Sequence, residues 1–195
     1  MLLSKKQIED YQNFGVIIIK DVYKEWIEPL RKGFQKVLDK PSIHGRENVD
    51  EKEGRFFEDY CNWERIGEFK DCIFNSPGAQ IVAEATNSKS SQIFHEHIFI
   101  KEPGTNKETP WHQDMPYYCV DGNDTGSFWI PLDEVDKENN LKLILGSHKW
   151  QKLIRPTKWS TNQSWYKDDT SFMDLPSSEE FRKNILIPEL SLGDA

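Results

Sequence analysis

The sequence predicts one α+β domain, mainly β, in which N-terminal helices precede a β-sandwich or barrel. Its 195 residues are a length typical of a single domain. Apolar residues recur at helical intervals in residues 1–90, whereas short β-rich runs separated by turn residues follow from Ser91 onward. We therefore expect a single domain over 1–195, with 1–90 as a helical and strand support region and 91–195 as the β core.

The first helix of the support region is expected to begin after Ser4. Ser4 and Gln7 have capping-box spacing, and Gly15 stands at a position typical of a helix C-terminus. Residues 16–19 are β-branched and apolar, which predicts a buried strand directly after this helix.

Two more helices are expected in the support region. The second ends before Pro41, and its apolar positions recur every three or four residues: Trp26, Leu30, Phe34, Val37 and Leu38. Ser76 and Pro77 form a typical N-terminus for the third helix. The charged, glycine-containing stretch 44–55 is expected to be a loop.

The strands expected in the second half lie between turn signals such as Pro103-Gly104. They are 92–101, 109–120, 126–132, 141–145 and 185–190. Residues 151–184 show no clear period and are long for a plain connection, so we expect a lid-like insertion there. The alternative is a surface excursion packed by its own aromatic residues, which are Trp159, Trp165, Tyr166 and Phe172.

Composition excludes several classes of partner. Lys and Arg number 25 against 33 Asp and Glu, so the net charge of −8 argues against nucleic-acid binding, which needs a basic surface. No apolar run approaches the roughly 20 residues of a membrane helix, and Leu3 leads into charged Lys5 and Lys6 rather than into a signal-peptide core. The three cysteines form no CxxC pair, which fits a reducing compartment. We expect a cytoplasmic protein without a membrane partner.

His112 and Asp114 are the candidate metal ligands. On an extended segment they would project from the same face, roughly 6–7 Å apart along the backbone, and could converge on one ion. An imidazole and a carboxylate are two thirds of the 2-His-1-carboxylate triad, whose open positions suit non-haem Fe(II) oxygenases. Gln113 would point to the opposite face and is expected to hydrogen-bond the scaffold. The tripeptide alone is common by chance, so spacing favours a metal site only weakly.

Four motifs in order resemble the phytanoyl-CoA dioxygenase family. They are 97–104 (HIFIKEPG), 109–117 (TPWHQDMPY), 127–133 (SFWIPLD) and 145–150 (LGSHKW). Residues 7–11 and 15–18 also resemble the family's first helix and strand. The family comprises Fe(II)- and 2-oxoglutarate-dependent oxygenases on a double-stranded β-helix, or jelly roll. The resemblance therefore implies a jelly-roll core after the N-terminal helices, and Fe(II), 2-oxoglutarate and O2 as cofactor and co-substrates.

Carried over by position, the resemblance makes His112 and Asp114 the first two iron ligands. It makes Lys101 a basic residue that can approach 2-oxoglutarate. Candidates for the wall of the substrate pocket are His97, Trp111, Tyr117 and Trp129. The implied reaction is hydroxylation of a small organic substrate, which the sequence does not identify.

The family pattern also has a second metal-binding histidine and an arginine after a late Gly-Asp turn. The turn here is Gly193-Asp194 and the sequence ends at Ala195, so we expect a chain truncated at its C-terminus that lacks the last strands of the jelly roll. Exposed strand edges would then favour a homodimer. Two alternatives stay open. One is a catalytically incomplete jelly-roll fragment, and the other is a cupin-like metal-binding protein that uses His95, His97 and His112.

Overall fold

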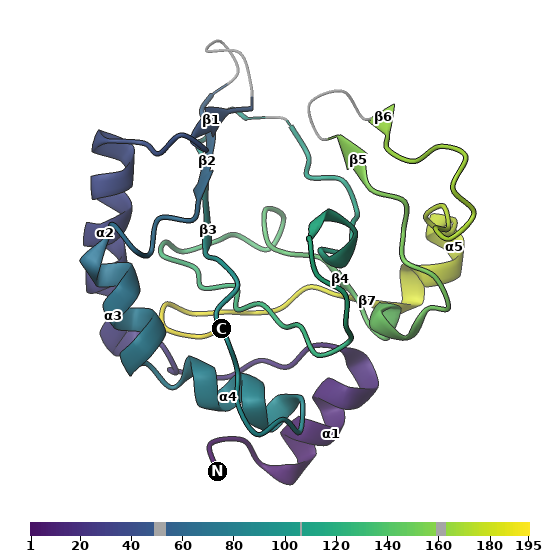
Figure 1. Ribbon diagram of the computed structural model, residues 1–195, viewed down its shortest axis with the longest axis horizontal. Coiled ribbons are helices and arrows are strands. Elements are labelled where there is room, and N and C mark those ends of the chain that lie inside the picture. The colour runs from purple at the N-terminus through teal and green to yellow at the C-terminus, as the bar shows by residue number, and fades with distance from the viewer. Residues whose placement is uncertain (49–53, 106, 159–162) are drawn as a thin grey trace.

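Helices border a set of small antiparallel sheets in the computed structural model, which describes residues 1–48, 54–105, 107–158 and 163–195 (Figure 1). The α-helices are α1 (Lys5–Phe14), α2 (Ile27–Asp39), α3 (Gly67–Asn75), α4 (Gly78–Ala85) and α5 (Ser178–Phe181). The strands are β1 (Arg46–Glu47), β2 (Phe56–Tyr60), β3 (His97–Lys101), β4 (Leu143–Ile144), β5 (Thr157–Lys158), β6 (Gln163–Ser164) and β7 (Ile185–Leu186). Short 3-10 helices are η1 (Lys24–Trp26), η3 (Met115–Tyr117), η4 (Ser147–Lys149) and η5 (Arg182–Asn184).

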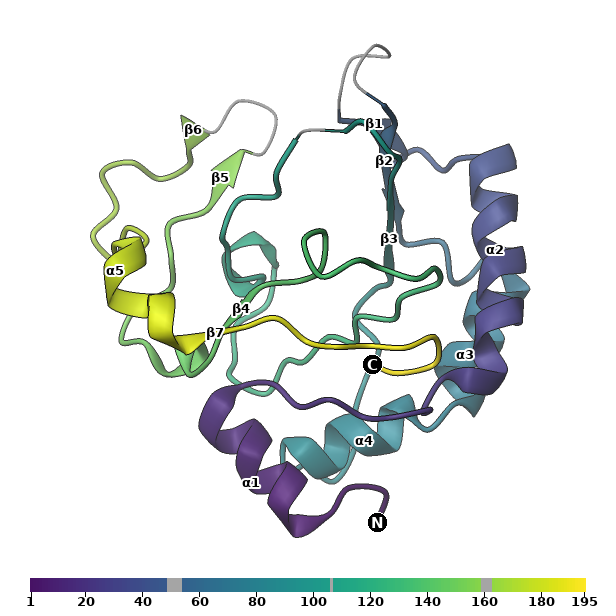
Figure 2. The same ribbon diagram turned by 180° about the vertical axis from the view of Figure 1, so that it is seen from behind.

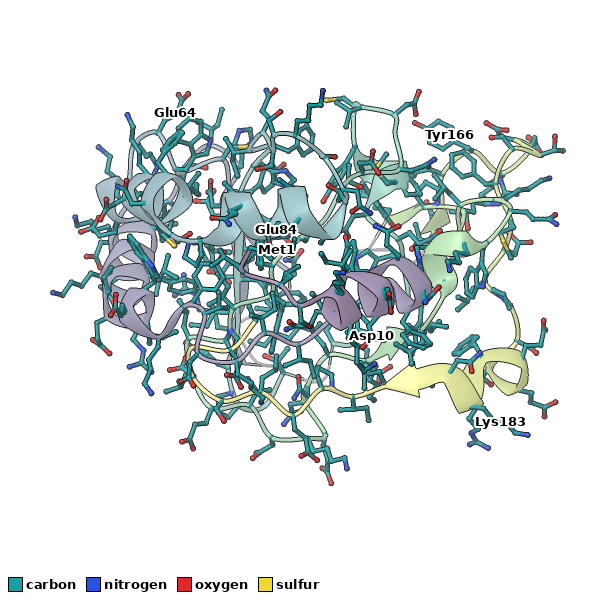
Figure 3. The ribbon with its side chains drawn as sticks, turned by 90° about the horizontal axis from the view of Figure 1, so that it is seen from below. Met1, Asp10, Glu64, Glu84, Tyr166 and Lys183 are labelled. Atoms are coloured by element: carbon teal, nitrogen blue, oxygen red, sulfur yellow. The ribbon has the colours of Figure 1, made fainter. Side chains whose placement is uncertain are left out.

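The three expected N-terminal helices are confirmed as α1, α2 and α4. The Ser4 side chain accepts from the Gln7 amide while the Gln7 side chain accepts from the Ser4 amide, so the capping box forms. Gly15 ends α1 in the left-handed region, with φ of 77°. The N-terminus is then fixed to α4, because Glu84 accepts hydrogen bonds from the amides of Leu2 and Leu3, and Figure 3 shows Met1 beside Glu84.

Strand β2 and helix α3 were not expected from the sequence, and together they organise the largest sheet. Antiparallel β1, β2 and β3 lie in that order, and all five residues of β2 pair with β3. Phe57, with Val37 of α2 and Phe69 of α3, belongs to one buried cluster against which Ile98 and Ile100 of β3 pack. One face of the sheet is therefore covered by α2 and α3. The opposite face, here called the open face, carries Phe56, Glu58, Tyr60, His97, Phe99 and Lys101.

A second buried cluster joins α1 and α4 to the C-terminal half of the chain. It contains Leu3, Ile81 and Ala85, and Phe128 packs against it. Residues 16–19 form no strand, which corrects that expectation, yet Ile19 exchanges two backbone hydrogen bonds with Ala195. Figure 2 shows the C-terminal segment running beside this part of the chain.

The expected jelly-roll core is not confirmed, because no sheet of the described residues closes into a barrel. The strands expected over 109–120 and 126–132 are irregular, and those over 141–145 and 185–190 shorten to β4 and β7. Prolines remove backbone donors at positions 110, 116 and 131. A β-prone segment also needs a neighbouring strand for its remaining backbone groups, and no such neighbour lies beside these two segments in the described ranges.

The segment 151–184 folds back on itself around Arg155. The Arg155 side chain donates to the backbone oxygens of Tyr166 and Asp169 and forms an ion pair with Asp174. Ile154 forms an isolated parallel bridge with Met173. Trp159, one of the aromatic residues expected to pack this segment, lies outside the described residues. In the described portion of the chain, no helix combines the length and the apolar character needed to cross a bilayer.

The buried carboxylate of Asp59 ties β2 to the chain after α2. It accepts hydrogen bonds from the amide of Ser42 at 2.7 Å and from the amide of Tyr60 at 2.8 Å, and a further bond from the Ser42 hydroxyl. Burial raises the pKa of Asp59, but these donors outweigh burial and the net pKa is lowered.

Replacing Asp59 with asparagine should destabilise the protein at neutral pH and much less in acid. A carboxyl whose folded pKa is lowered stabilises fully above its unfolded pKa of about 3.9 and loses that contribution as pH falls through the folded pKa. Urea unfolding from pH 6 to pH 3 should therefore show a gap between Asp59→Asn and the unmodified protein that narrows below pH 4. A gap of constant size would contradict the role of the Asp59 charge. Asp71→Asn, which removes an exposed carboxylate, is the matched control.

Candidate metal centre

His112 and Asp114 lie in an irregular segment that turns into η3. The expectation that both stand on one extended strand is wrong, because Asp114 has helical backbone angles, φ −71° and ψ −38°, and immediately precedes η3. This turn brings the carboxylate back toward the imidazole. His112 Nε2 and Asp114 Oδ1 are 3.3 Å apart. The two side chains therefore converge, as expected, through a turn rather than through strand alternation.

The hydrogen bond at Nδ1 of His112 determines which ring nitrogen carries the proton in the neutral imidazole. Nδ1 lies 2.8 Å from the carbonyl oxygen of Pro110, and a carbonyl can only accept, so Nδ1 carries the proton. In neutral His112 the lone pair of Nε2 then faces Asp114 Oδ1. Two acceptors at this distance repel unless a cation lies between them, either a proton on Nε2 or a metal ion. A backbone carbonyl on the far nitrogen is also the arrangement that orients metal-binding histidines.

The spacing of the two donor atoms suits one shared ion. Ligand atoms each about 2.1 Å from a divalent metal and at right angles to each other are about 3 Å apart. The observed 3.3 Å between Nε2 and Oδ1 is close to that value. A nitrogen and an oxygen donor are also the types that the 2-His-1-carboxylate triad uses. His112 and Asp114 thus fit two of the three positions of such a triad.

The other carboxylate oxygen of Asp114 is held by two hydroxyl groups. Oδ2 accepts from the hydroxyl of Tyr118 at 3.3 Å and from the hydroxyl of Ser127 at 3.4 Å. Oδ1 is therefore the oxygen directed at His112.

The pKa values of this group reflect the same contacts. Burial lowers the pKa of His112, but its hydrogen bonds to Asp114 and to the Pro110 carbonyl outweigh burial, and the net pKa is raised. The pKa of Asp114 is lowered, chiefly by its hydrogen bond with His112. Burial, followed by the charge of Asp114, raises the pKa of Tyr118 to about 12. A proton or another cation is accordingly favoured between the imidazole and the carboxylate.

The aromatic ring of Tyr117 packs against His112, and Trp111 adjoins His112 in the sequence. The ring of Tyr117 is 6.0 Å from the imidazole, edge to face, and 5.6 Å from the ring of Trp165. The Tyr117 hydroxyl donates to the Thr157 carbonyl and accepts from the Thr157 amide, both at 2.9 Å. Trp111 packs against Phe181 at 5.5 Å. Segment 151–184 is therefore in direct contact with the residues beside the candidate ligands.

A cavity of about 110 Å³ lies beside His112. Its walls come from four parts of the chain: residues 14–16, 111–113, 142–144 and 147–154, with gaps in the last. The expectation that Gln113 hydrogen-bonds the scaffold is confirmed, because its amide donates to the Ser147 carbonyl at 3.0 Å and its oxygen accepts from the Ile154 amide at 2.8 Å. Gln113 thus holds the candidate metal centre to this wall.

The other predicted site residues lie elsewhere. His97 is on the open face, with Nε2 3.3 Å from the buried carboxylate of Glu58. Lys101, on the same face, donates to the Lys107 carbonyl at 3.1 Å and to the Thr109 hydroxyl at 2.9 Å, while its Nζ lies 4.5 Å from the centre of the Phe56 ring. Burial lowers the pKa of Lys101. Trp129 is half-buried in the irregular segment 126–132 and does not line the cavity that the described residues form.

The cupin-like alternative is not supported. Among the described residues, no three or more His, Cys, Asp or Glu side chains are grouped so that they could hold a metal ion. His95, His97 and His112 all lie within the described ranges, so they do not form such a ligand set. The ring of His95 instead packs edge to face on Tyr118 at 5.5 Å.

Sequence reasoning missed the hydrogen-bond partners of the two candidate ligands. The Pro110 carbonyl, the Tyr118 hydroxyl and the Ser127 hydroxyl are all polar groups without any spacing pattern in the sequence. Ser127 is thirteen positions from Asp114, and only the course of an irregular segment brings the two together.

Comparison with known proteins identifies the family of the chain. The family model described as phytanoyl-CoA dioxygenase (PhyH) matches residues 11–179. No curated protein and no solved structure matches the chain. The matched stretch contains both His112 and Asp114, together with the open face and most of segment 151–184. The chain belongs to the phytanoyl-CoA dioxygenase family, a family of Fe(II)- and 2-oxoglutarate-dependent oxygenases.

Proposed function

We propose that this protein hydroxylates a small organic substrate in a reaction that depends on Fe(II) and 2-oxoglutarate, with His112 and Asp114 as metal ligands. The observation that carries the proposal is the 3.3 Å separation of His112 Nε2 and Asp114 Oδ1, while Nδ1 is held by the Pro110 carbonyl. A third protein ligand is not assigned, since none stands beside these two among the described residues.

Iron and 2-oxoglutarate, when bound, supply the oxidation: O2 is consumed, 2-oxoglutarate becomes succinate and CO2, and the substrate gains a hydroxyl group. The protein's own groups bind and orient. The Pro110 carbonyl keeps the proton of neutral His112 on Nδ1, so that Nε2 can act as a metal ligand. Gln113 fixes the backbone between the two ligands by bonding to Ser147 and Ile154.

The substrate is proposed to bind near the aromatic side chains that adjoin the ligands. Tyr117 and Trp111 support this proposal by their contacts with His112 and Phe181. His97 and Trp129 are proposed as more distant pocket residues on the strength of the family resemblance. Segment 151–184, which Tyr117 contacts through Thr157, is proposed to close over the substrate like a lid.

The test is anaerobic titration of the protein with Fe(II) and then with 2-oxoglutarate. We expect a visible charge-transfer band that needs both components, because the co-substrate chelates the bound metal. Succinate, which binds without the 2-oxo group, is the matched control and should give no band. Absence of the band with 2-oxoglutarate at saturating Fe(II) would overturn the proposed function.

Lys101 is proposed to meet a carboxylate of 2-oxoglutarate. Its ammonium group is held near residues 107–109, which lead directly into the candidate metal centre. Lys101→Gln should raise the dissociation constant of 2-oxoglutarate roughly tenfold or more, since a hydrogen bond to a charged group contributes ~1.5–3 kcal/mol. The charge-transfer titration measures this constant. Metal affinity should not change, and Lys89→Gln, which removes an exposed positive charge, should behave as the unmodified protein.

Self-association is proposed through the edges of the three-stranded sheet β1-β2-β3. β1 and β3 are its outer strands, and unpaired edges favour pairing with a second copy. Sedimentation equilibrium should show a dimer at micromolar concentration. A monomer at every concentration would contradict this.

A further inference from the structure

We propose that Tyr118 and Ser127 are positioning residues that orient Asp114, so that only its Oδ1 atom is presented to the metal. This inference rests on the proposed function, because it concerns the same site. Both hydroxyls lie within hydrogen-bond distance of the same carboxylate oxygen, Oδ2, at 3.3 and 3.4 Å. They leave Oδ1 directed at His112.

Asp114 needs such support because its own local structure does not fix its side chain. It precedes a three-residue 3-10 helix, makes no capping hydrogen bond there, and its side chain is 48% exposed. The carboxylate group of a half-exposed aspartate rotates readily, since its terminal torsion has a broad energy profile. Two donors restrict that rotation: Tyr118 at the end of the same turn and Ser127 thirteen positions from Asp114.

The donors are themselves anchored by packed aromatic rings. The ring of Tyr118 lies 4.8 Å from Phe94 and 5.5 Å from His95, and both of these residues precede β3. Ser127 is followed by Phe128, whose ring meets that of buried Tyr23 at 5.4 Å. Thus one hydroxyl is positioned by residues just before β3, and the other by its neighbour Phe128, which packs against the second buried cluster. The orientation of Asp114 therefore depends on two independent parts of the fold.

A carboxylate held through Oδ2 would hold a metal through Oδ1 alone. Metal binding then costs little reorganisation, because Nε2 and Oδ1 already stand 3.3 Å apart. Partners of this kind, which bond to a ligand rather than to the metal, typically change metal affinity by about 10–100-fold when they are removed. Both hydroxyls act on one oxygen, so the losses of metal-binding free energy caused by removing each of them should not be additive.

The experiment compares Co(II) binding by Tyr118→Phe, Ser127→Ala and the double variant, with Co(II) as an air-stable probe. We expect each single variant to bind Co(II) about 10–100-fold more weakly and to alter the visible absorption of the bound ion. We also expect the free-energy loss of the double variant to differ from the sum of the two single losses. Tyr60→Phe is the matched control, because its hydroxyl bonds to Arg46 instead. Its Co(II) affinity and spectrum should be unchanged.

The metal centre and the positioning role of Tyr118 and Ser127 can be disproved separately. If the unmodified protein binds no Co(II), the proposed metal centre is wrong. If it binds Co(II) and Tyr118→Phe binds with equal affinity and an identical spectrum, only the positioning role is wrong. The crystal structure of the metal-free double variant is an independent check, since Asp114 should rotate away from His112. An unchanged Asp114 side chain there would overturn the inference whatever the metal affinity.

Discussion

Replacing either His112 or Asp114 is expected to remove specific metal binding, which is the largest functional effect that the structure predicts. Removing groups that only support a ligand costs about 10–100-fold in affinity, and removing a ligand atom should cost more. His112→Ala takes away Nε2, and Asp114→Asn replaces a charged oxygen donor by a neutral amide. Fe(II) or Co(II) titration calorimetry measures the loss. The 2-oxoglutarate charge-transfer band should disappear with it.

Controls are available for both substitutions. His148→Ala removes an imidazole that lies in the cavity wall and whose Nε2 is 3.2 Å from the Gln12 carbonyl. Asp133→Asn removes a carboxylate that is 86% exposed. Neither should change metal affinity if the metal is bound where we propose. Equal losses in His112→Ala and His148→Ala would place the metal elsewhere, and full retention by Asp114→Asn would exclude Asp114 as a ligand.

The parts of the fold that the sequence predicted are those determined by neighbouring residues. Helix α1 follows from Ser4, Gln7 and Gly15, all within twelve positions of one another. Strand β2 was missed because its sequence, FFEDY, carries two acidic residues that are nonetheless buried. Glu58 meets Arg46 and His97, and Asp59 meets Ser42, and these partners come from other segments. A local sequence pattern does not show partners from other segments, so it does not predict that these two carboxylates are buried.

The candidate site, like the fold, was predicted only in part. The sequence predicted that His112 and Asp114 would meet, because two positions in an extended segment share a face. The two side chains do meet, but a turn brings them together. That turn contains Met115 and Pro116, which lie within the strand predicted over 109–120. The supporting hydroxyls were not predicted. Tyr118 is only four positions from Asp114 but meets it through the turn at η3, and the position of Ser127 depends on where an irregular segment returns.

Phe57→Ala is expected to give the largest loss of stability, about 3–5 kcal/mol, which is typical of removing a buried phenylalanine ring. Phe57 is only 2% exposed and lies among Val37, Ile66 and Phe69. The cavity left behind cannot be filled readily, because α2 and α3 are both fixed against the same side of β2. A domain's net stability is about 5–15 kcal/mol, so this single change removes a large share of it. Urea or guanidinium unfolding measures the difference.

The outcome also tests how the sheet is built. Phe74, at the end of α3, is 60% exposed and has its ring 5.8 Å from that of Trp63, so Phe74→Ala should cost only about 1 kcal/mol. If the two variants lost equal stability, the face of β2 that carries Phe57 would not be the one buried by α2 and α3. The open face would then have to be reassigned. His97 and Lys101 lie on that face by the register of β2 and β3, so their proposed roles depend on the same result.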